Sequence, residues 1–187
     1  GRGETVGAQL TGDDRVRGVM FTGSTEVATL LQRNIASRLD AQGRPIPLIA
    51  ETGGMNAMIV DSSALTEQVV IDVLASAFDS AGQRCSALRV LCLQDEIADH
   101  TLKMLRGAMA ECRMGNPGRL TTDIGPVIDS EAKANIERHI QTMRSKGRPV
   151  FQAVRENSED AREWQSGTFV APTLIELDDF AELQKEV

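Results

Sequence analysis

The sequence contains few aromatic residues: no Tyr, one Trp and five Phe among its 187 positions. Without aromatic side chains on which bases stack, a platform for single-stranded nucleic acid is not expected. The net charge of −7 and the scattered positions of Lys and Arg also argue against a nucleic-acid surface. The composition therefore predicts no nucleic-acid partner for this region.

Long apolar runs and paired cysteines are also missing. No run approaches the roughly 18 apolar residues that span a bilayer, and no signal peptide is expected. The three Cys residues lack the spacing of a disulfide scaffold, which is typical of a reducing cytoplasm. His100 and His139 fall on expected helices, and no spacing typical of a metal site occurs. We therefore predict a cytoplasmic location and no metal site.

Short apolar runs alternate with amphipathic segments along the chain. This alternation predicts an α/β fold with mainly parallel strand pairing. Strands are expected at residues 16–21, 46–50, 57–60, 88–93, 150–154 and 168–177, the one at 88–93 covered on both faces. Helices are expected up to about Thr11 and over residues 25–39, 65–81, 97–114, 130–146 and 178–187, with a solvated connector at 155–165.

A carboxylate and a thiol stand in positions that suit covalent acyl chemistry. Glu51 follows the apolar run 46–50 and precedes Gly53-Gly54, whose glycines permit close approach of the backbone to a ligand. Cys85 lies 34 positions after Glu51, in the loop Gly82-Gln-Arg-Cys-Ser86. A thiolate attacks a carbonyl, and a carboxylate activates water against the resulting thioester. The alternative is a Cys and a Glu with unrelated structural roles.

Two other thiols compete with Cys85 for the role of nucleophile. Cys92 falls within the apolar strand expected at 88–93, and Cys112 lies near a helix end, so both suit small core residues. Cys85 stands beside the cation Arg84, whose charge favours a thiolate. Cys85 is therefore the predicted nucleophile.

The turn Gly23-Ser24 joins an expected strand to an expected helix. Amide N–H groups and the helix dipole suit a phosphate at such a turn. Plain N-capping by Ser24, with Glu26 favourable in the first helical turn, accounts for the same residues, and both roles can hold together. The glycine-spaced segment Gly1 to Gly7 is expected to be a loop that opens a helix, and alone it is only a weak signal of a ligand loop.

Three motifs in order resemble the signatures of the NAD(P)-dependent aldehyde dehydrogenase superfamily. They are Phe21-Thr-Gly-Ser-Thr-Glu26, Glu51-Thr-Gly-Gly-Met-Asn56 and Gly82-Gln-Arg-Cys85. The wider segments 50–65 and 81–94 are similar to one branch, the glutamate-semialdehyde (pyrroline-5-carboxylate) dehydrogenase region of bacterial bifunctional enzymes of proline utilisation. The resemblance runs essentially from end to end, and the three motifs together are highly specific.

The resemblance implies an aldehyde dehydrogenase-like α/β fold in two parts. Residues 1–54 would be the C-terminal part of a Rossmann-type NAD-binding domain. Residues 55–187 would be most of the α/β catalytic domain, which bears the thiol and is truncated. Because whole enzymes of this family are longer, we expect the chain to be a fragment.

The resemblance also implies roles for individual residues. It makes Cys85 the nucleophile and Glu51 the base that activates the deacylating water, and it places the cofactor pyrophosphate at Gly23 and Ser24. No metal is implied.

Three further positions follow from the same resemblance. Ser86 would help to hold the substrate carboxylate, and Glu186 would bond the nicotinamide ribose, although its motif stops before the expected Phe-Gly-Pro. Thr52 is expected to contact the cofactor. It stands where Leu is common in the superfamily, and Met55 stands where many members carry Lys or Gln, so nicotinamide contacts are expected to differ.

The implied activity of the parent enzyme is oxidation of L-glutamate γ-semialdehyde to L-glutamate with NAD, through a thioester on Cys85. FAD would belong only to a separate proline dehydrogenase domain of the same parent chain. The parent is expected to be a cytoplasmic homo-oligomer, peripheral to the inner membrane, and the fragment alone is expected to be inactive. The alternatives are a non-catalytic aldehyde dehydrogenase-like module and an aldehyde dehydrogenase for another substrate. A cysteine hydrolase is disfavoured because no His is placed to pair with Cys85.

Overall fold

The computed structural model describes residues 3–153 and 166–183. The chain divides into two compact units, Gly1–Gly54 and Met55–Val187, and each is described by itself. Strands and helices alternate in both, so the predicted α/β class is confirmed. The functions that the resemblance assigns to the two units, cofactor binding and catalysis, stay a prediction.

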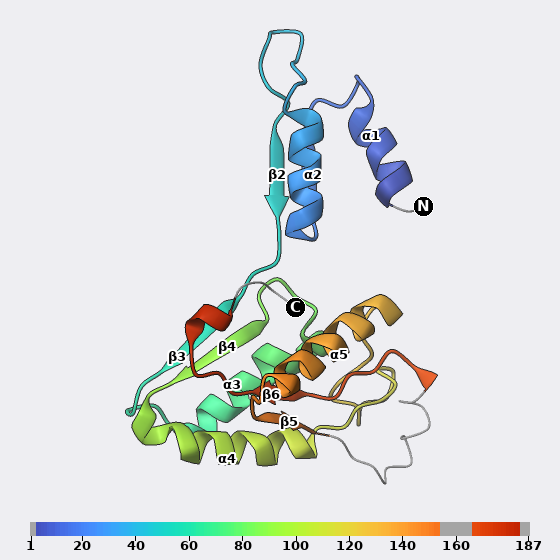
Figure 1. Ribbon diagram of the computed structural model, residues 1–187. Helices are drawn as coiled ribbons and strands as arrows, with labels where there is room; N and C mark the ends of the chain where they lie inside the picture. Colours follow the sequence, from blue (N-terminus) through green and yellow to red (C-terminus); the bar gives the residue numbers. More distant parts are fainter. Residues whose placement is uncertain (1–2, 154–165, 184–187) are drawn as a thin grey trace. The chain divides into compact units, whose positions relative to one another are not determined.

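The first unit contains one strand–helix–strand motif. A π-helical turn, Gly3–Gly7, leads into α1 (Ala8–Gly12), and then come β1 (Val19–Thr22), α2 (Thr25–Ile35) and β2 (Leu48–Glu51). The two strands pair in parallel, and α2 connects them. Figure 1 shows α2 beside β2. Few apolar side chains of this unit are buried; they are Ala28, Ile35 and Ile46.

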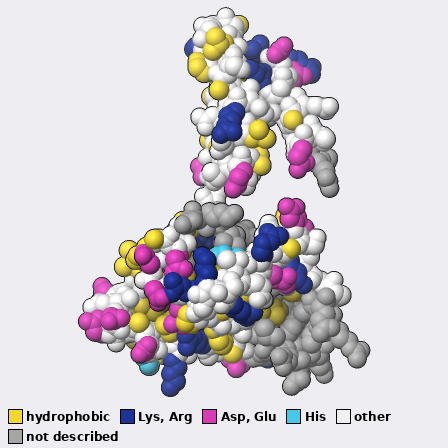
Figure 2. Space-filling model, viewed as in Figure 1, with side chains coloured by type: hydrophobic (Ala, Val, Ile, Leu, Met, Phe, Trp, Pro, Cys, Tyr) yellow, Lys and Arg dark blue, Asp and Glu magenta, His cyan; other side chains and the backbone are white. Residues whose placement is uncertain are grey.

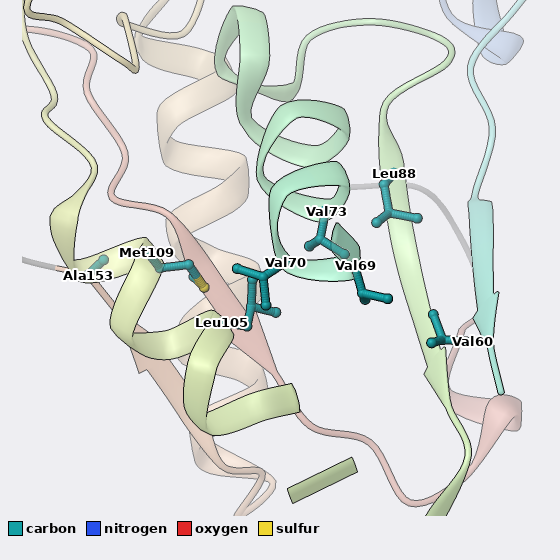
Figure 3. Close-up of a cluster of buried hydrophobic side chains, with 8 residues drawn as sticks. All are labelled: Val60, Val69, Val70, Val73, Leu88, Leu105, Met109 and Ala153. Carbon is teal, nitrogen blue, oxygen red and sulfur yellow. The ribbon is translucent and has the colours of Figure 1, made fainter. Parts of the chain in front are cut away.

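A parallel strand pair and two helices build the core of the second unit. β3 (Asn56–Val60) and β4 (Leu88–Leu93) are joined through α3 (Thr66–Phe78) and a 3-10 turn (Asp79–Gly82), and α4 (Asp95–Glu111) follows. The helix α3 packs on both β4 and α4. Figure 3 shows its valines between Leu88 of the strand pair and Leu105 of α4. The buried cluster consists of Val60, Val69, Val70, Val73, Leu88, Leu105, Met109 and Ala153.

The rest of the second unit adds a helix and an antiparallel strand pair. α5 (Ser130–Ser145) begins after Asp129, whose carboxylate caps the helix by accepting a hydrogen bond from the Ala132 N–H at 2.8 Å. β5 (Val150–Gln152) pairs with β6 (Thr173–Ile175), and a 3-10 turn, Phe180–Glu182, follows. Two of the three strand pairs are parallel among the described residues, which matches the mainly parallel pairing expected.

Several expected boundaries were wrong. The opening glycine segment is helical from Gly3 and not a loop. The helix expected at 65–81 ends at Phe78. The strand expected at 168–177 covers only 173–175, and it begins just after Pro172, which has no N–H to donate. The connector at 155–165 lies outside the described residues, as does the end of the helix expected at 178–187.

The strand at 88–93 was expected to be covered on both faces, and β4 is only partly covered. Alternation places Met58 and Val60 toward the buried cluster and turns Ile59 the other way, where its side chain is 84% exposed. Only Leu88 is buried along β4. Acidic and basic side chains lie interspersed on the face that Figure 2 shows. Within the described ranges, no helix is long and apolar enough to cross a bilayer.

Candidate active site

In the first unit, two predicted site segments meet at the carboxyl ends of β1 and β2. Thr22 pairs with Glu51 in the parallel register, and the Gly23 N–H donates a hydrogen bond to the Glu51 carbonyl at 3.1 Å. The Glu51 side chain is exposed, and Thr52 is half-buried. The Gly23 turn and the Glu51 backbone are therefore held together by one hydrogen bond.

Ser24 caps the helix that starts at this turn. Its hydroxyl accepts a hydrogen bond from the Val27 N–H at 3.2 Å, and its carbonyl accepts one from the Ala28 N–H at 3.0 Å. The first amides of a helix have no intrahelical partners and carry the positive end of the dipole, so this terminus suits one phosphate group. A Cβ at Gly23 would lie 2.5 Å from the Phe21 ring, so a bare α-carbon suits this turn. The capping role is thus present, and the phosphate role stays a prediction that these residues fit.

In the second unit, Cys85 occupies the middle of a tight turn. The Ala87 N–H donates a hydrogen bond to the Arg84 carbonyl at 3.0 Å, which places Cys85 and Ser86 at the two central positions. Both residues are exposed, whereas Ala87 is fully buried. The turn therefore exposes the Cys85 thiol and the Ser86 hydroxyl to solvent, while the next residue, Ala87, is buried.

The chain reaches this turn through an unusual backbone. Ser80, Ala81 and Gly82 have φ values of 57°, 53° and 68°, all in the left-handed region that costs non-glycine residues roughly 1–2 kcal/mol each. A Cβ on Gly82 would lie 2.7 Å from the Ala77 carbonyl oxygen. The glycine of the nucleophile motif is thus required both by its φ and by the close approach of α3.

The Arg84 side chain bonds to the end of α3. Its guanidinium donates hydrogen bonds to the carbonyls of Ala75 and Ser76, at 3.1 and 3.3 Å, in the last turn of α3. A cation there stabilises the negative end of the helix dipole. The charge that was expected to favour the thiolate is directed at the helix end.

Two amide side chains anchor the turn, and the sequence analysis assigned no role to either. The Asn56 Nδ2 group donates to the carbonyls of Cys85 and Ala87, at 2.7 and 2.9 Å. The Gln83 Oε1 atom accepts from the Ile128 N–H at 2.6 Å, which ties the turn to the loop before α5. Gln83 belongs to the nucleophile motif, and this position is the feature of the sequence that could have indicated its role. Asn56 is the last residue of the Glu51 motif.

The rival thiols are less accessible than Cys85. Cys92 and Cys112 are half-buried, where full burial was expected, and the Cys112 Sγ atom lies 3.6 Å from the Ala108 carbonyl. Cys85 is exposed. Exposure therefore favours Cys85 among the three thiols.

The remaining predicted positions belong to different units or lie outside the described residues. Glu51 belongs to the first unit and Cys85 to the second, so each is described only in its own surroundings. Glu186 lies outside the described residues. In residues 3–153 and 166–183 no three His, Cys, Asp or Glu side chains form a group that could hold a metal ion.

A family model matches almost the whole chain. The model of the aldehyde dehydrogenase family covers residues 1–186. Over all 187 residues the chain is 92% identical to the bifunctional protein PutA of Salmonella typhimurium, of which it spans 14%. It is 30% identical to the 1-pyrroline-5-carboxylate dehydrogenase of Bacillus cereus, of which it spans 35%. The chain thus spans a small part of these relatives' length.

Solved structures agree with this assignment. A crystal structure of a mutant of Bradyrhizobium japonicum Proline Utilization A (PutA) matches the whole chain with a TM-score of 0.88 and 44% identity, over 18% of that protein's chain. A structure of Staphylococcus aureus betaine aldehyde dehydrogenase in complex with NAD+ matches the whole chain with a TM-score of 0.84 and 29% identity, over 36% of that chain.

Proposed function

Because the chain belongs to the aldehyde dehydrogenase family, we propose that it is part of a longer enzyme that oxidises L-glutamate γ-semialdehyde to L-glutamate with NAD. The observation that carries the proposal is the exposed thiol of Cys85 at the centre of an anchored turn. The names of the two relatives, PutA and 1-pyrroline-5-carboxylate dehydrogenase, support this substrate over other aldehydes.

The chemistry divides into an oxidation and a hydrolysis. The Cys85 thiolate adds to the aldehyde carbon, and the carbonyl π electrons move to oxygen as a hemithioacetal oxyanion. The backbone N–H of Cys85 stabilises this oxyanion, together with an Asn side chain from outside the chain. The C–H bond of the hemithioacetal then breaks with loss of hydride, leaving a thioester on Cys85. NAD, held at the Gly23-Ser24 turn, would supply the acceptor for that hydride.

Hydrolysis of the thioester restores the thiol. Glu51 takes a proton from water, the hydroxide oxygen attacks the acyl carbon, and the C–S bond breaks to release L-glutamate. Ser86, exposed next to the nucleophile, supplies a hydroxyl for the carboxylate of the substrate. Gly23 and Ser24 offer amides to a cofactor phosphate, and Thr52 and Glu186 are the further cofactor contacts.

The parent enzyme would contain more than this chain. The word bifunctional in the name of the Salmonella relative supports a second activity in the same parent. We propose that this activity is a proline dehydrogenase with FAD bound in its own domain. We place the parent in the cytoplasm, peripheral to the inner membrane, as a homo-oligomer.

Paired cysteine variants of the full-length parent test the proposal. With glutamate semialdehyde and NAD, Cys85→Ser should lower the rate of NADH formation by about 1,000-fold or more, because the covalent step is lost. Cys92→Ser, the matched control, should retain the rate. Wild-type enzyme that forms no NADH would favour a non-catalytic module, and equal rates for the two variants would exclude Cys85 as nucleophile.

The substrate is tested separately. An aldehyde without the amino acid group, such as propionaldehyde, should show kcat/KM at least about tenfold lower than glutamate semialdehyde, since polar groups built to bind a carboxylate are left unpaired. Equal values would favour an aldehyde dehydrogenase for another substrate.

A further inference from the structure

Asn56 contacts the backbone on both sides of Ser86. It is the first residue of β3, and its side-chain Nδ2 group donates to the Cys85 carbonyl at 2.7 Å and to the Ala87 carbonyl at 2.9 Å. The amide group has two N–H donors. Both carbonyls are therefore held by one planar group.

The strand ladder is irregular at the same place. Asn56 pairs with Leu88, but the next residue, Ala57, pairs with Val90, so the register shifts by one residue between them. Such a bulge interrupts the regular backbone pairing and bends the strand. The Asn56 side chain supplies hydrogen bonds to carbonyls of the turn just before this irregular point.

The direction of a carbonyl fixes the direction of its peptide plane. In a trans peptide, the N–H points opposite to the C=O. A Cys85 carbonyl drawn toward Asn56 therefore turns the Ser86 N–H away from β3, and it limits rotation about the Cα–C bond of the nucleophile itself.

We propose that Asn56 is a positioning residue, which aligns the Cys85 thiol by holding the carbonyls of Cys85 and Ala87. The inference rests on the proposed function, because it assigns the alignment to hemithioacetal formation and hydride loss. Reacting atoms have to lie about 3–3.5 Å apart with aligned orbitals, so a small rotation of the nucleophile lowers the rate.

The turn has other supports, so the loss of Asn56 should not unfold it. The Ala87 N–H still bonds to Arg84, and Gln83 still bonds to Ile128. Asn56 and Cys85 are both exposed, so water can replace the hydrogen bond to the Cys85 carbonyl. An effect on chemistry larger than the effect on stability is the signature of positioning.

Asn56→Leu in the full-length parent removes both donors at nearly constant size and without adding charge. The rate constant of the NADH burst at saturating substrates should fall about tenfold, and the KM for NAD should stay unchanged. Iodoacetamide, a small reagent without a fixed approach, should still label Cys85 within about threefold of the wild-type rate. Asn56→Ser, whose hydroxyl is too short to reach both carbonyls, should behave alike if the Leu variant does not fold.

Asn135→Leu is the matched control. Asn135 is an exposed residue of α5 whose side chain accepts a hydrogen bond from Arg138. Its replacement should change neither the rate constant of the NADH burst nor the rate of Cys85 labelling. An unchanged burst in the Asn56 variants, with a normal wild-type enzyme, would overturn the inference alone. A parallel fall in burst and labelling would show a structural role only and would also overturn it. Wild-type enzyme without aldehyde oxidation would instead contradict the proposed function.

Discussion

Single side chains differ most clearly in their exposure to solvent. Cys85 is exposed in its turn, and Cys92 and Cys112 are half-buried. Limiting iodoacetamide should therefore label Cys85 first in the native parent enzyme, because only an accessible thiolate reacts. Peptide mass spectrometry over a time course measures the three rates. Labelling of Cys92 or Cys112 at the same rate would contradict the assignment.

The pKa of His139 depends on its surroundings in the second unit. Partial burial on α5 lowers the pKa of His139 below its ordinary 6.5, and the positive charge of Lys146 lowers it further. Between the two pKa values the unfolded chain binds the proton and the folded chain does not. The contribution of His139 to the free energy of unfolding is therefore fully present above about pH 6.5. It is lost as the pH falls through the lower pKa of the folded chain.

The reaction of His139 with diethyl pyrocarbonate measures the pKa of His139 in the folded protein, because only neutral imidazole reacts. The rate should rise with a midpoint below pH 6.5, and Lys146→Ala should move the midpoint upward. A midpoint at 6.5 or above would show that burial does not govern this side chain.

Among the secondary-structure elements, two glycines with positive φ allow the cost of backbone strain to be measured apart from the cost of steric crowding. Gly82 and Gly147 have φ values of 68° and 79°, but a Cβ meets the Ala77 carbonyl at 2.7 Å only at Gly82. Gly147→Ala should lower the free energy of unfolding by about 1–2 kcal/mol. Gly82→Ala should lower it by about 2–4 kcal/mol, because overpacking adds to the strain. Urea unfolding provides the comparison, and equal losses would mean that the backbone relaxes away from Ala77.

Most elements were predictable, and the misses have physical causes. The apolar run 88–93 and the cap Asp129 mark β4 and α5 because each signal is local. The end of α3 was missed because Ser80 and Ala81 are left-handed, although neither is a glycine or an asparagine.

The candidate site follows a similar division. Cys85, Glu51, Gly23 and Ser24 stood out through short motifs. The role of Asn56 was missed because its hydrogen bond reaches a carbonyl 29 positions away, and one polar residue before an apolar strand does not identify such a partner.

The whole 187-residue chain offers only a small part of an NAD-binding site. One phosphate turn contributes a few charge-assisted hydrogen bonds of about 1.5–3 kcal/mol each. Association costs about 4–15 kcal/mol, and adenosine contacts from the rest of a dinucleotide fold would be needed to offset it. The isolated 187-residue chain should bind NAD with a dissociation constant of roughly millimolar or weaker. Calorimetry tests this, and a micromolar constant would show that the cofactor site is complete in this chain.

In the proposed mechanism, Cys85 carries a thioester that Glu51 hydrolyses. Rapid-mixing kinetics of Glu51→Gln in the full-length parent tests it most directly, with Glu67→Gln, an exposed carboxylate at the start of α3, as control. The Glu51 variant should release a burst of about one NADH per site and then turn over slowly, because acylation proceeds and hydrolysis stalls. The control should turn over normally. A Glu51 variant with no burst and no hydride transfer would contradict the account.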